Sequence, residues 1–339
     1  MKVLVTGGAG YIGSVLIRLL LERGYDVKCL DRFFFGKETL DKISDDIRLE
    51  LIKDDIRWFD PNILDDVDVV VDMASLSNDP AGELDPEKTM EINYKGRARV
   101  ATLAKKHGVQ RYILASSCSV YGFRDGVLDE NASTNPLTTY AQANLMAEGE
   151  TLPLADEKFA ATVLRQATVY GLSSRMRFDL AINGMVLGFY KNGKIPIMRD
   201  GTQWRPFVHV KDTSKAFILT IESEKDVVSG ERFNIGSNEQ NYQIFPLAEL
   251  VADSIGIPFN YEWYGSPDDR SYQISFDSAR NVLNYKSDYT PKEGAMEVYN
   301  ALQNGDITDS MKTITVEWYK HLIEVNNLIR DVKIGDVLL

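Results

Sequence analysis

The sequence predicts a doubly wound α/β fold, with a parallel sheet of the Rossmann type and a smaller, mixed α/β lobe in the C-terminal half. Strand-like apolar runs alternate with helix-like stretches through the first half of the chain. These runs are almost continuously apolar, which is typical of parallel strands covered on both faces. A glycine-rich turn joins the first run directly to a helix pattern, as in sheets that bind nucleotides at their strand ends.

The first strand, turn and helix contain the strongest local motif, TGGAGYIG at residues 6–13. Glycines in such a turn let a pyrophosphate approach the backbone, and the positive helix N-terminus favours its charge. Asp31 ends the second apolar run and suits the adenosine ribose hydroxyls, which favours NAD over NADP, whereas an arginine such as Arg32 would suit a 2′-phosphate. A triphosphate-binding P-loop is excluded, because Ser14 and Val15 stand where it requires Lys and Ser or Thr. The residues expected to hold a dinucleotide here are Gly7, Gly10, Tyr11, Ile12, Gly13, Asp31 and Arg32.

The remaining elements follow in order along the chain. We expect strands at residues 2–6, 26–31, 48–53, 68–74, 111–117 and 161–165, and helices at 11–23, 37–45, 85–107 and 140–157. The alternation weakens after residue 172, where we expect helices near 178–192, 244–255, 290–303 and 310–326, and the tail 325–339 has no assignable pattern. We therefore predict an NAD-binding domain of residues 1–172, to which 207–237 return, and a substrate-binding lobe of 173–206 and 238–339.

Composition narrows the class of partner. The net charge of −12 over 339 residues argues against nucleic acid or an anionic membrane surface. No apolar run approaches the ~20 residues that span a bilayer, and no signal peptide is expected. The two cysteines lie in apolar, strand-like contexts, which fits a reducing cytoplasm, and the three histidines share no ligand spacing, so we expect no metal site.

Several spaced motifs carry a family resemblance. They are Asp55-Ile56, Met73-Ala74-Ser75, Asn93, SSCSVYG at 116–122, the segment 136–148 with Tyr140, 165–171, RPFVHVKD at 205–212 and FNIG at 233–236. With the opening TGGAGYIG, this order resembles the extended short-chain dehydrogenase/reductases, in particular nucleotide-sugar epimerases and dehydratases of the UDP-galactose 4-epimerase type. The resemblance implies NAD as cofactor, with Asp55 and Ile56 over the adenine, Met73, Ala74 and Ser75 under the pyrophosphate, and Asn93 on the long helix.

The same resemblance assigns the reacting centre to Tyr140, Ser117 and Asn144. In the family a tyrosine exchanges a proton with a sugar hydroxyl, and a serine or threonine, here Ser117, hydrogen-bonds the sugar oxygen. A tyrosine ionises only near pH ~10, and the family lowers this pKa with a lysine one helical turn further on. Asn144 occupies that position. It can still hydrogen-bond the nicotinamide ribose, but it carries no charge.

Substrate recognition is implied for a nucleotide-diphosphate sugar. Arg205 and Arg270 resemble the diphosphate-binding arginines of the family, Thr168 replaces its asparagine, and Asn183 is a further polar candidate. Cys118 and Ser119 stand where the 4,6-dehydratases carry an Asp-Glu pair, which disfavours elimination of water.

The sequence therefore predicts an NAD-dependent oxidoreductase acting at the sugar C4 position, as a 4-epimerase or a C4 dehydrogenase/reductase. The alternative is a catalytically impaired NAD-binding regulatory or scaffold protein of the same fold, which the neutral Asn144 favours. The helix patterns 85–107 and 140–157 resemble those that pair across a two-fold axis in this family, so we expect a homodimer.

Overall fold

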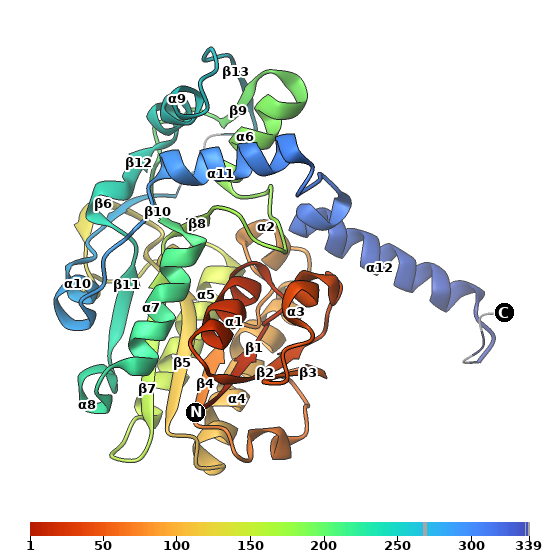
Figure 1. The fold of residues 1–339 in the computed structure, drawn as a ribbon, viewed down its shortest axis with the longest axis vertical. Helices are drawn as coiled ribbons and strands as arrows, with labels where there is room; N and C mark the ends of the chain where they lie inside the picture. Colours follow the sequence, from red (N-terminus) through yellow and green to blue (C-terminus); the bar gives the residue numbers. More distant parts are fainter. Residues whose placement is uncertain (267–269, 336, 338–339) are drawn as a thin grey trace.

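The structure, a computed structural model, describes residues 1–266, 270–335 and 337. Its centre is a seven-stranded parallel sheet in the order β11-β7-β5-β4-β1-β2-β3, with helices on both faces (Figure 1). The order reverses beside β1, and the crevice beyond this point is where such sheets bind ligands. The strands are β1 (Lys2–Thr6), β2 (Asp26–Asp31), β3 (Leu49–Lys53), β4 (Val69–Asp72), β5 (Arg111–Ser117), β7 (Ala160–Gln166) and β11 (Arg232–Ile235). All six predicted strands are confirmed.

Three of the helices predicted in the first half differ in the structure. The predicted helix 85–107 is divided into α3 (Pro86–Met90), a π-helical segment (Glu91–Gly96) and α4 (Arg97–Lys106). The predicted helix 140–157 is shorter, because α5 (Thr139–Thr151) gives way to a 3-10 turn that contains Pro153, which has no N–H to donate. The remaining helical segments here are α1 (Tyr11–Glu22), a 3-10 turn (Glu38–Ile43) in place of a predicted helix, and α2 (Asp79–Gly82).

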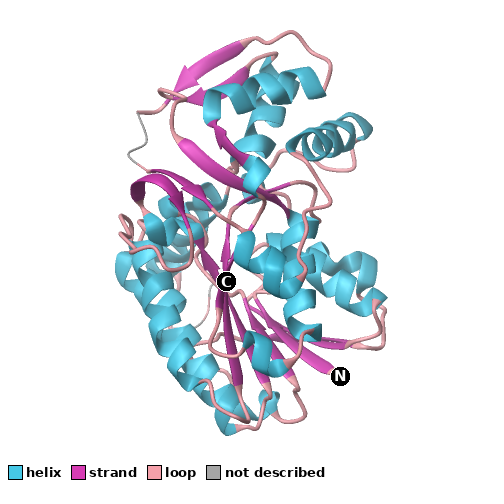
Figure 2. Ribbon diagram, turned by 90° about the vertical axis from the view of Figure 1, so that its left-hand side faces the viewer, coloured by secondary structure: helices cyan, strands magenta, loops and turns pink. Residues whose placement is uncertain are grey.

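Three small sheets lie beyond the carboxyl edge of the large one and combine strands of the second half with β6 and β8 of the first (Figure 2). They pair β8 (Thr168–Tyr170) and β12 (Asn241–Gln243) with β10 (Trp204–His209), β13 (Tyr261–Tyr264) with β9 (Ile195–Met198), and β14 (Ser271–Ile274) with β6 (Phe123–Leu128). The helices are α6 (Ala181–Asn192), α7 (Val210–Glu222), α8 (Lys225–Val228), α9 (Ile244–Ser254), α10 (Asp277–Leu283) and α11 (Pro291–Asn304). Of the segments expected to return to the large sheet, β11 joins it, whereas residues 207–209 of β10 pair with β8.

The last helix, α12 (Thr315–Val332), begins and ends later than the predicted 310–326 and so occupies part of the tail that has no assignable sequence pattern. It projects away from the body of the molecule in Figure 1. Its first turns are attached, since Trp318 Nε1 donates to the carbonyl oxygen of Phe34 at 2.6 Å and the Tyr319 ring lies 5.5 Å from that of Phe35.

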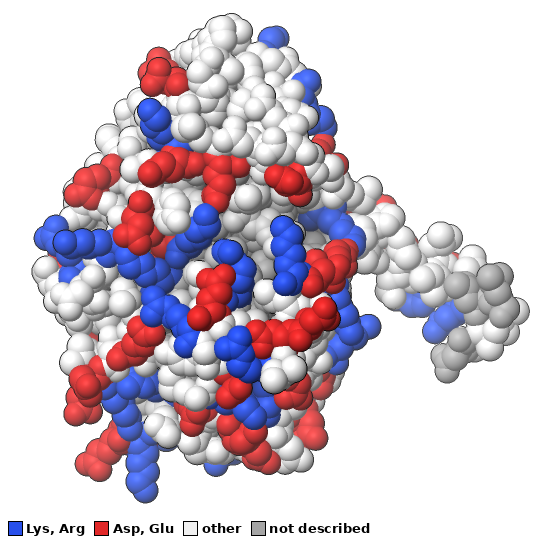
Figure 3. All heavy atoms as spheres, in the orientation of Figure 1, with Lys and Arg blue, Asp and Glu red and all other residues white. Residues whose placement is uncertain are grey.

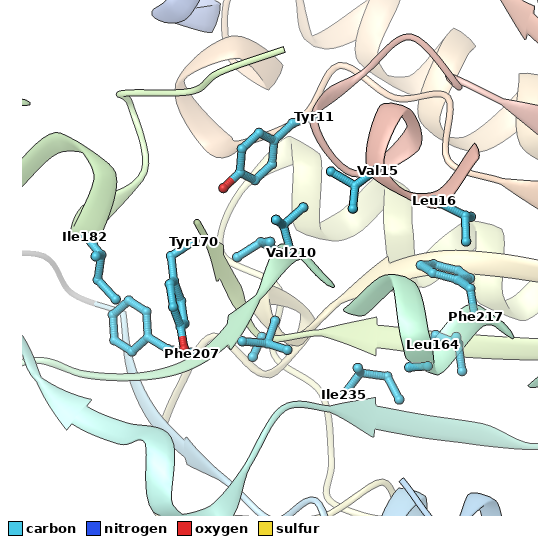
Figure 4. Close-up of a cluster of buried hydrophobic side chains, with 14 of the residues drawn as sticks. Tyr11, Val15, Leu16, Leu164, Tyr170, Ile182, Phe207, Val210, Phe217 and Ile235 are labelled. Atoms are coloured by element: carbon cyan, nitrogen blue, oxygen red, sulfur yellow. The ribbon is translucent and has the colours of Figure 1, made fainter. Parts of the chain in front are cut away.

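One apolar core joins the large sheet to the lobe (Figure 4). Leu16 of α1 and Phe217 of α7 belong to it on one face of the sheet, and the same cluster continues through Tyr170 of β8 to Phe207 and Ile182 in the lobe. The two halves of the cavity described below are therefore held by a shared core.

A buried ion pair fixes α5 against the sheet. The Arg165 guanidinium donates to both Glu148 oxygens, at 3.0 Å from Nε and 2.6 Å from Nη2, and neither side chain is more than 3% exposed. Arg165 Nη1 also donates to the Tyr121 hydroxyl at 2.8 Å. Because α5 carries Tyr140, this pair positions the predicted reacting centre.

Replacing Glu148 with alanine should lower the free energy of unfolding by about 3–5 kcal/mol, because the Arg165 charge is left buried without its partner. Denaturant unfolding measures this change. Glu150→Ala on the exposed side of the same helix is the matched control and should change it by less than about 0.5 kcal/mol. A Glu148→Ala effect as small as that of the control would contradict the assigned role of the pair.

Candidate active site

A cavity of about 790 Å³ opens at the carboxyl ends of the central strands, between the sheet and the lobe. Its wall includes most of the residues predicted from the sequence. Those on the wall are Gly7, Gly10, Tyr11, Ile12, Gly13, Asp31, Arg32, Asp55, Ile56, Met73, Ala74, Ser75, Ser117, Tyr140, Thr168, Arg205 and Arg270. Asn93, Asn144 and Asn183 are not part of this wall.

The glycine-rich turn leaves the start of α1 open to the cavity. A Cβ at Gly13 would lie 2.5 Å from the carbonyl oxygen of Gly7, so a side chain does not fit there. No side chain caps the helix at Gly10, and the first-turn amides have no partner within the helix. These amides and the helix dipole suit an anionic group that approaches this end of α1.

Asp31 and Arg32 lie at the end of β2. Asp31 accepts hydrogen bonds from the backbone N–H groups of Ala9, at 3.0 Å, and Phe33, at 2.7 Å, which hold its carboxylate at the cavity wall. Arg32 Nη1 donates to Asp55 at 2.7 Å. Burial acts to raise the pKa of Asp55, but hydrogen bonds from Arg57 and Arg32 lower it to about 2. Since the Arg32 charge is compensated by Asp55, the arrangement favours a ribose diol over a 2′-phosphate.

Arg175 is a wall residue that the sequence analysis missed. Its guanidinium lies 3.7 Å from the centroid of the Phe35 ring, and Nη2 donates to the Thr315 hydroxyl at 2.9 Å. Among the described residues, Nε and Nη1 have no hydrogen-bond partner. Burial, with the nearby charge of Arg177, lowers the pKa of Arg175 to about 9. A buried guanidinium with unused donors fits an anionic ligand such as a pyrophosphate, and the closely spaced Arg175 and Arg177 in the segment between β8 and α6 are the sequence signal for it.

Asn183 lies behind the cavity wall and links three segments of the chain by hydrogen bonds. Its amide accepts from the Gly171 N–H at 3.0 Å and donates to the Tyr11 hydroxyl at 3.1 Å and to the Arg177 carbonyl oxygen at 2.9 Å. It is fully buried, so it holds the start of α1 to the lobe, and we do not assign it a substrate contact. Asn93 likewise holds the loop after β4, through hydrogen bonds to both backbone groups of Leu76.

Tyr140 and Ser117 face the cavity from α5 and the end of β5. Thr138 caps α5 by accepting from the Ala141 N–H at 3.2 Å, which places Tyr140 in the first turn. Burial raises the pKa of Tyr140, as does the Asp79 carboxylate, while the Arg97 charge and hydrogen bonds with Asn144 and Ser117 act in the opposite direction. Tyr140 therefore depends on nearby positive charge to become a base.

Asn144 lies one helical turn beyond Tyr140 and is buried. Its Nδ2 donates to the Tyr140 carbonyl oxygen at 3.0 Å, and its Oδ1 accepts from Arg97 Nη1 at 2.8 Å. Arg97 is a second buried arginine that the sequence analysis did not identify.

The arginines on the lobe side are held in defined positions. Arg205 Nη1 donates to the carbonyl oxygens of Trp204, at 2.8 Å, and Arg270, and its guanidinium lies 5.2 Å from the centroid of the Tyr272 ring. Arg270 forms an ion pair with Asp79. Both line the cavity together with Thr168, so this end suits a second anionic group.

Charge on the molecular surface is mixed. On the face shown in Figure 3, acidic and basic side chains alternate over the sheet domain, and the upper part of the lobe is largely uncharged. No helix in the described part of the chain combines the length and the apolar character needed to cross a bilayer. The described residues contain no group of three or more His, Cys, Asp or Glu side chains placed to hold a metal ion.

Comparisons with known proteins agree with this geometry. The profile of the NAD dependent epimerase/dehydratase family matches residues 3–236. The UDP-glucose 4-epimerase of Lactobacillus helveticus is 28% identical, over 84% of this chain and 92% of its own. UDP-glucuronic acid decarboxylase 1 of Arabidopsis thaliana is 29% identical, over 90% of this chain and 70% of its own. The structure of MoeE5 in complex with UDP-glucuronic acid and NAD superposes with a TM-score of 0.80 at 27% identity, covering 90% of this chain and all of that one.

Replacing Arg175 with methionine should weaken NAD binding about tenfold or more, because the buried cation would no longer donate to the dinucleotide. Isothermal calorimetry measures the affinity. Arg18→Met, on the exposed side of α1, is the control and should leave the affinity unchanged. Equal affinities for Arg175→Met and the unmodified protein would remove Arg175 from the cofactor site.

Proposed function

Because the chain belongs to the NAD dependent epimerase/dehydratase family, we propose that it is an oxidoreductase acting on a nucleotide-diphosphate sugar. The reaction takes place at the C4 hydroxyl or keto group, as a 4-epimerisation or as a net C4 dehydrogenation or reduction. The observation that carries this proposal is the placement of Tyr140 and Ser117 on the wall of one cavity with the glycine-rich turn and Arg205.

The residues present fit NAD. The open start of α1 and the unused donors of Arg175 suit the pyrophosphate, and the Asp31 carboxylate suits the adenosine ribose. Asp55 and Ile56 line the adenine end of this proposed path, and Met73, Ala74 and Ser75 line the wall beneath the pyrophosphate. Bound NAD supplies the acceptor and the donor of hydride.

The chain's own residues position the sugar and move its proton. Arg205, Arg270 and Thr168 hold the diphosphate at the lobe side of the cavity, so the sugar extends toward Tyr140 and Ser117. Ser117 hydrogen-bonds the C4 oxygen, and Tyr140 Oη accepts the hydroxyl proton on oxidation and returns it on reduction. Since the cavity lies between sheet and lobe, bulk water is displaced from the reacting atoms when substrate fills it.

A second candidate function is an NAD-binding regulatory or scaffold protein without turnover. The observation that favours it is Asn144, which is neutral and buried and does not reach the cavity wall. The two candidates differ in whether Tyr140 transfers a proton, so one substitution tests both.

Tyr140→Phe should reduce turnover of UDP-glucose or UDP-glucuronic acid by about 10²–10⁴-fold while leaving NAD affinity within a factor of about two. Coupled assays of 4-epimer formation, together with calorimetry, measure the two quantities. Tyr94→Phe, which removes an exposed hydroxyl bonded to Glu150, is the control. Equal turnover by Tyr140→Phe and the unmodified protein would contradict the mechanism. An unmodified protein that binds NAD but turns over no nucleotide sugar would favour the scaffold function.

We also propose a homodimer in the cytoplasm. The cytoplasmic location is supported by Cys29 and Cys118, which are both unpaired and buried. The dimer face would be formed by α4 and α5. Val100 and Ala104 are fully buried in the monomer core, so of the apolar residues on these helices Met146, at 42% exposed, is the main side chain left for a partner.

Light scattering at micromolar concentration should give the mass of a dimer, and Met146→Asp should shift the protein toward the monomer, because a carboxylate would be buried at the interface. Met296→Asp, on α11, replaces a methionine of similar exposure and should leave the mass unchanged. A monomeric mass for the unmodified protein would contradict the homodimer.

A further inference from the structure

The side chain of Arg97 is a buried cation directly behind the proposed base. It begins α4, next to the π-helical segment, and is fully inaccessible to solvent. Its guanidinium donates to Asn144 Oδ1 at 2.8 Å, to the Asp72 carbonyl oxygen at 3.2 Å and to the Ala115 carbonyl oxygen. These three acceptors are neutral, so the hydrogen bonds position the guanidinium without cancelling its charge.

The carboxylate that approaches Arg97 forms only a loose ion pair with it. Asp72 Oδ1 lies 4.0 Å from Arg97 Nε, beyond hydrogen-bond distance. The Asp72 carboxyl instead accepts hydrogen bonds from the hydroxyls of Thr6 and Tyr112, both at 2.5 Å, and burial raises its pKa. Asp72 therefore balances the positive charge of Arg97 only in part, and the remaining charge acts on Asn144 and Tyr140.

In the described part of the chain, the other charged groups near Tyr140 have ion-pair or hydrogen-bond partners of their own. On the α2 side, Asp79 forms an ion pair with Arg270, and Glu83 accepts from the Thr139 N–H at 2.7 Å. Across the cavity, Arg177 forms a bidentate ion pair with Asp179, at 3.0 and 2.9 Å. Among the described residues, Arg97 thus has no carboxylate within hydrogen-bond distance, and its ion pair with Asp72 spans 4.0 Å.

The chemistry of the guanidinium also fixes the direction of the Asn144 amide. A guanidinium has donors and no acceptor, so Asn144 must present Oδ1 to Arg97. Its Nδ2 group then points away from Arg97 and donates to the Tyr140 carbonyl oxygen at 3.0 Å. Asn144 therefore has its hydrogen-bond donor group on the side of Tyr140 and the positively charged Arg97 guanidinium on the side of its Oδ1.

We propose that Arg97 is a positioning residue for proton transfer at Tyr140: its guanidinium orients the Asn144 amide and provides the positive charge that stabilises the Tyr140 phenolate. This inference rests on the proposed function, in which Tyr140 is the base. It explains how a helix with a neutral residue at position 144 retains an electrostatic partner for the phenol. The pKa of Tyr140 is raised by burial and by Asp79, and Arg97 is among the groups that lower it.

The test compares the ionisation of Tyr140 in four variants of the full chain. The readout is tyrosinate absorbance against pH in the NAD-bound protein, taken as the difference from the matching Tyr140→Phe background. Arg97→Met should move the Tyr140 midpoint upward by about one pH unit or more, and Arg97→Lys should keep it within a few tenths of a unit. Asn144→Lys alone should lower the melting temperature, because it places a second cation against Arg97. The double variant Arg97→Met/Asn144→Lys should restore both the midpoint and the melting temperature.

Turnover provides an independent readout. In Arg97→Met, kcat near pH 7 should fall about tenfold with KM little changed, and should approach the value of the unmodified protein at high pH, where Tyr140 ionises unaided. Tyr112→Phe is the matched control, because it removes hydrogen bonds to Asp72 and to the Arg97 carbonyl oxygen but keeps the charge. It should lower stability without moving the midpoint. If Arg97→Met does not fold, Arg97→Gln also removes the charge and gives the same readout.

The outcomes separate this inference from the proposed function. A Tyr140 midpoint that is the same in Arg97→Met and the unmodified protein, or a fall in kcat that is equal at every pH, would overturn the role of Arg97 even if Tyr140→Phe is inactive. A midpoint that depends on Arg97 in a protein that turns over no nucleotide sugar would support the role of Arg97 while refuting the proposed function.

Discussion

The hydrogen bonds of the Tyr11 hydroxyl are the interaction on which the geometry of the cavity depends. This hydroxyl donates to the Gly171 carbonyl oxygen at 2.6 Å and accepts from Asn183, so it joins the start of α1 to the loop after β8 and to the first lobe helix. Ser173 extends the same junction by donating to the Tyr11 carbonyl oxygen at 2.7 Å. Because the hydroxyl is buried, loss of these bonds would leave polar groups unsatisfied at the point where the sheet domain meets the lobe.

Three of the buried arginines show two ways of using positive charge in a molecule whose net charge is −12. Arg165 is neutralised by Glu148 and serves to fix α5, whereas Arg175 and Arg97 are left without a carboxylate in hydrogen-bond contact among the described residues. The first arrangement is structural. In the other two, protein groups hold one side of the guanidinium. The unused donors of Arg175 then point toward the cavity, and the charge of Arg97 acts on the proposed base, Tyr140. A global excess of negative charge is thus compatible with an anionic substrate, because local geometry decides which charges it meets.

The sequence predicts which residues line the candidate site where their position depends on backbone pattern. One example is the spacing between the strand–turn–helix motif at residues 6–13 and the carboxylate of Asp31, which follows from the fold itself. Arg97 and Arg175 were missed, because a charged residue within a helix or after a strand is usually exposed, and only tertiary contacts reveal that these two are buried. Asn183 was chosen for its polarity, but the sequence does not show that its hydrogen bonds are consumed within the fold. The π-helical break at 91–96 gives no periodic signal, whereas Pro153 could have been used to end α5 earlier.

The attachment of α12 has a consequence for how a bound dinucleotide is retained. Ile314, Val316 and Tyr319 form part of the cavity wall, and Thr315 accepts the hydrogen bond of Arg175. The start of the last helix therefore lines one side of the cavity, and its outer turns, whose residues are mostly exposed, extend beyond the body of the molecule (Figure 1). A ligand that contacts this wall favours the docked position of the helix, and the docked helix in turn favours the bound ligand. Cofactor affinity and the docking of the C-terminal helix are thus thermodynamically linked, so that a change in one changes the other.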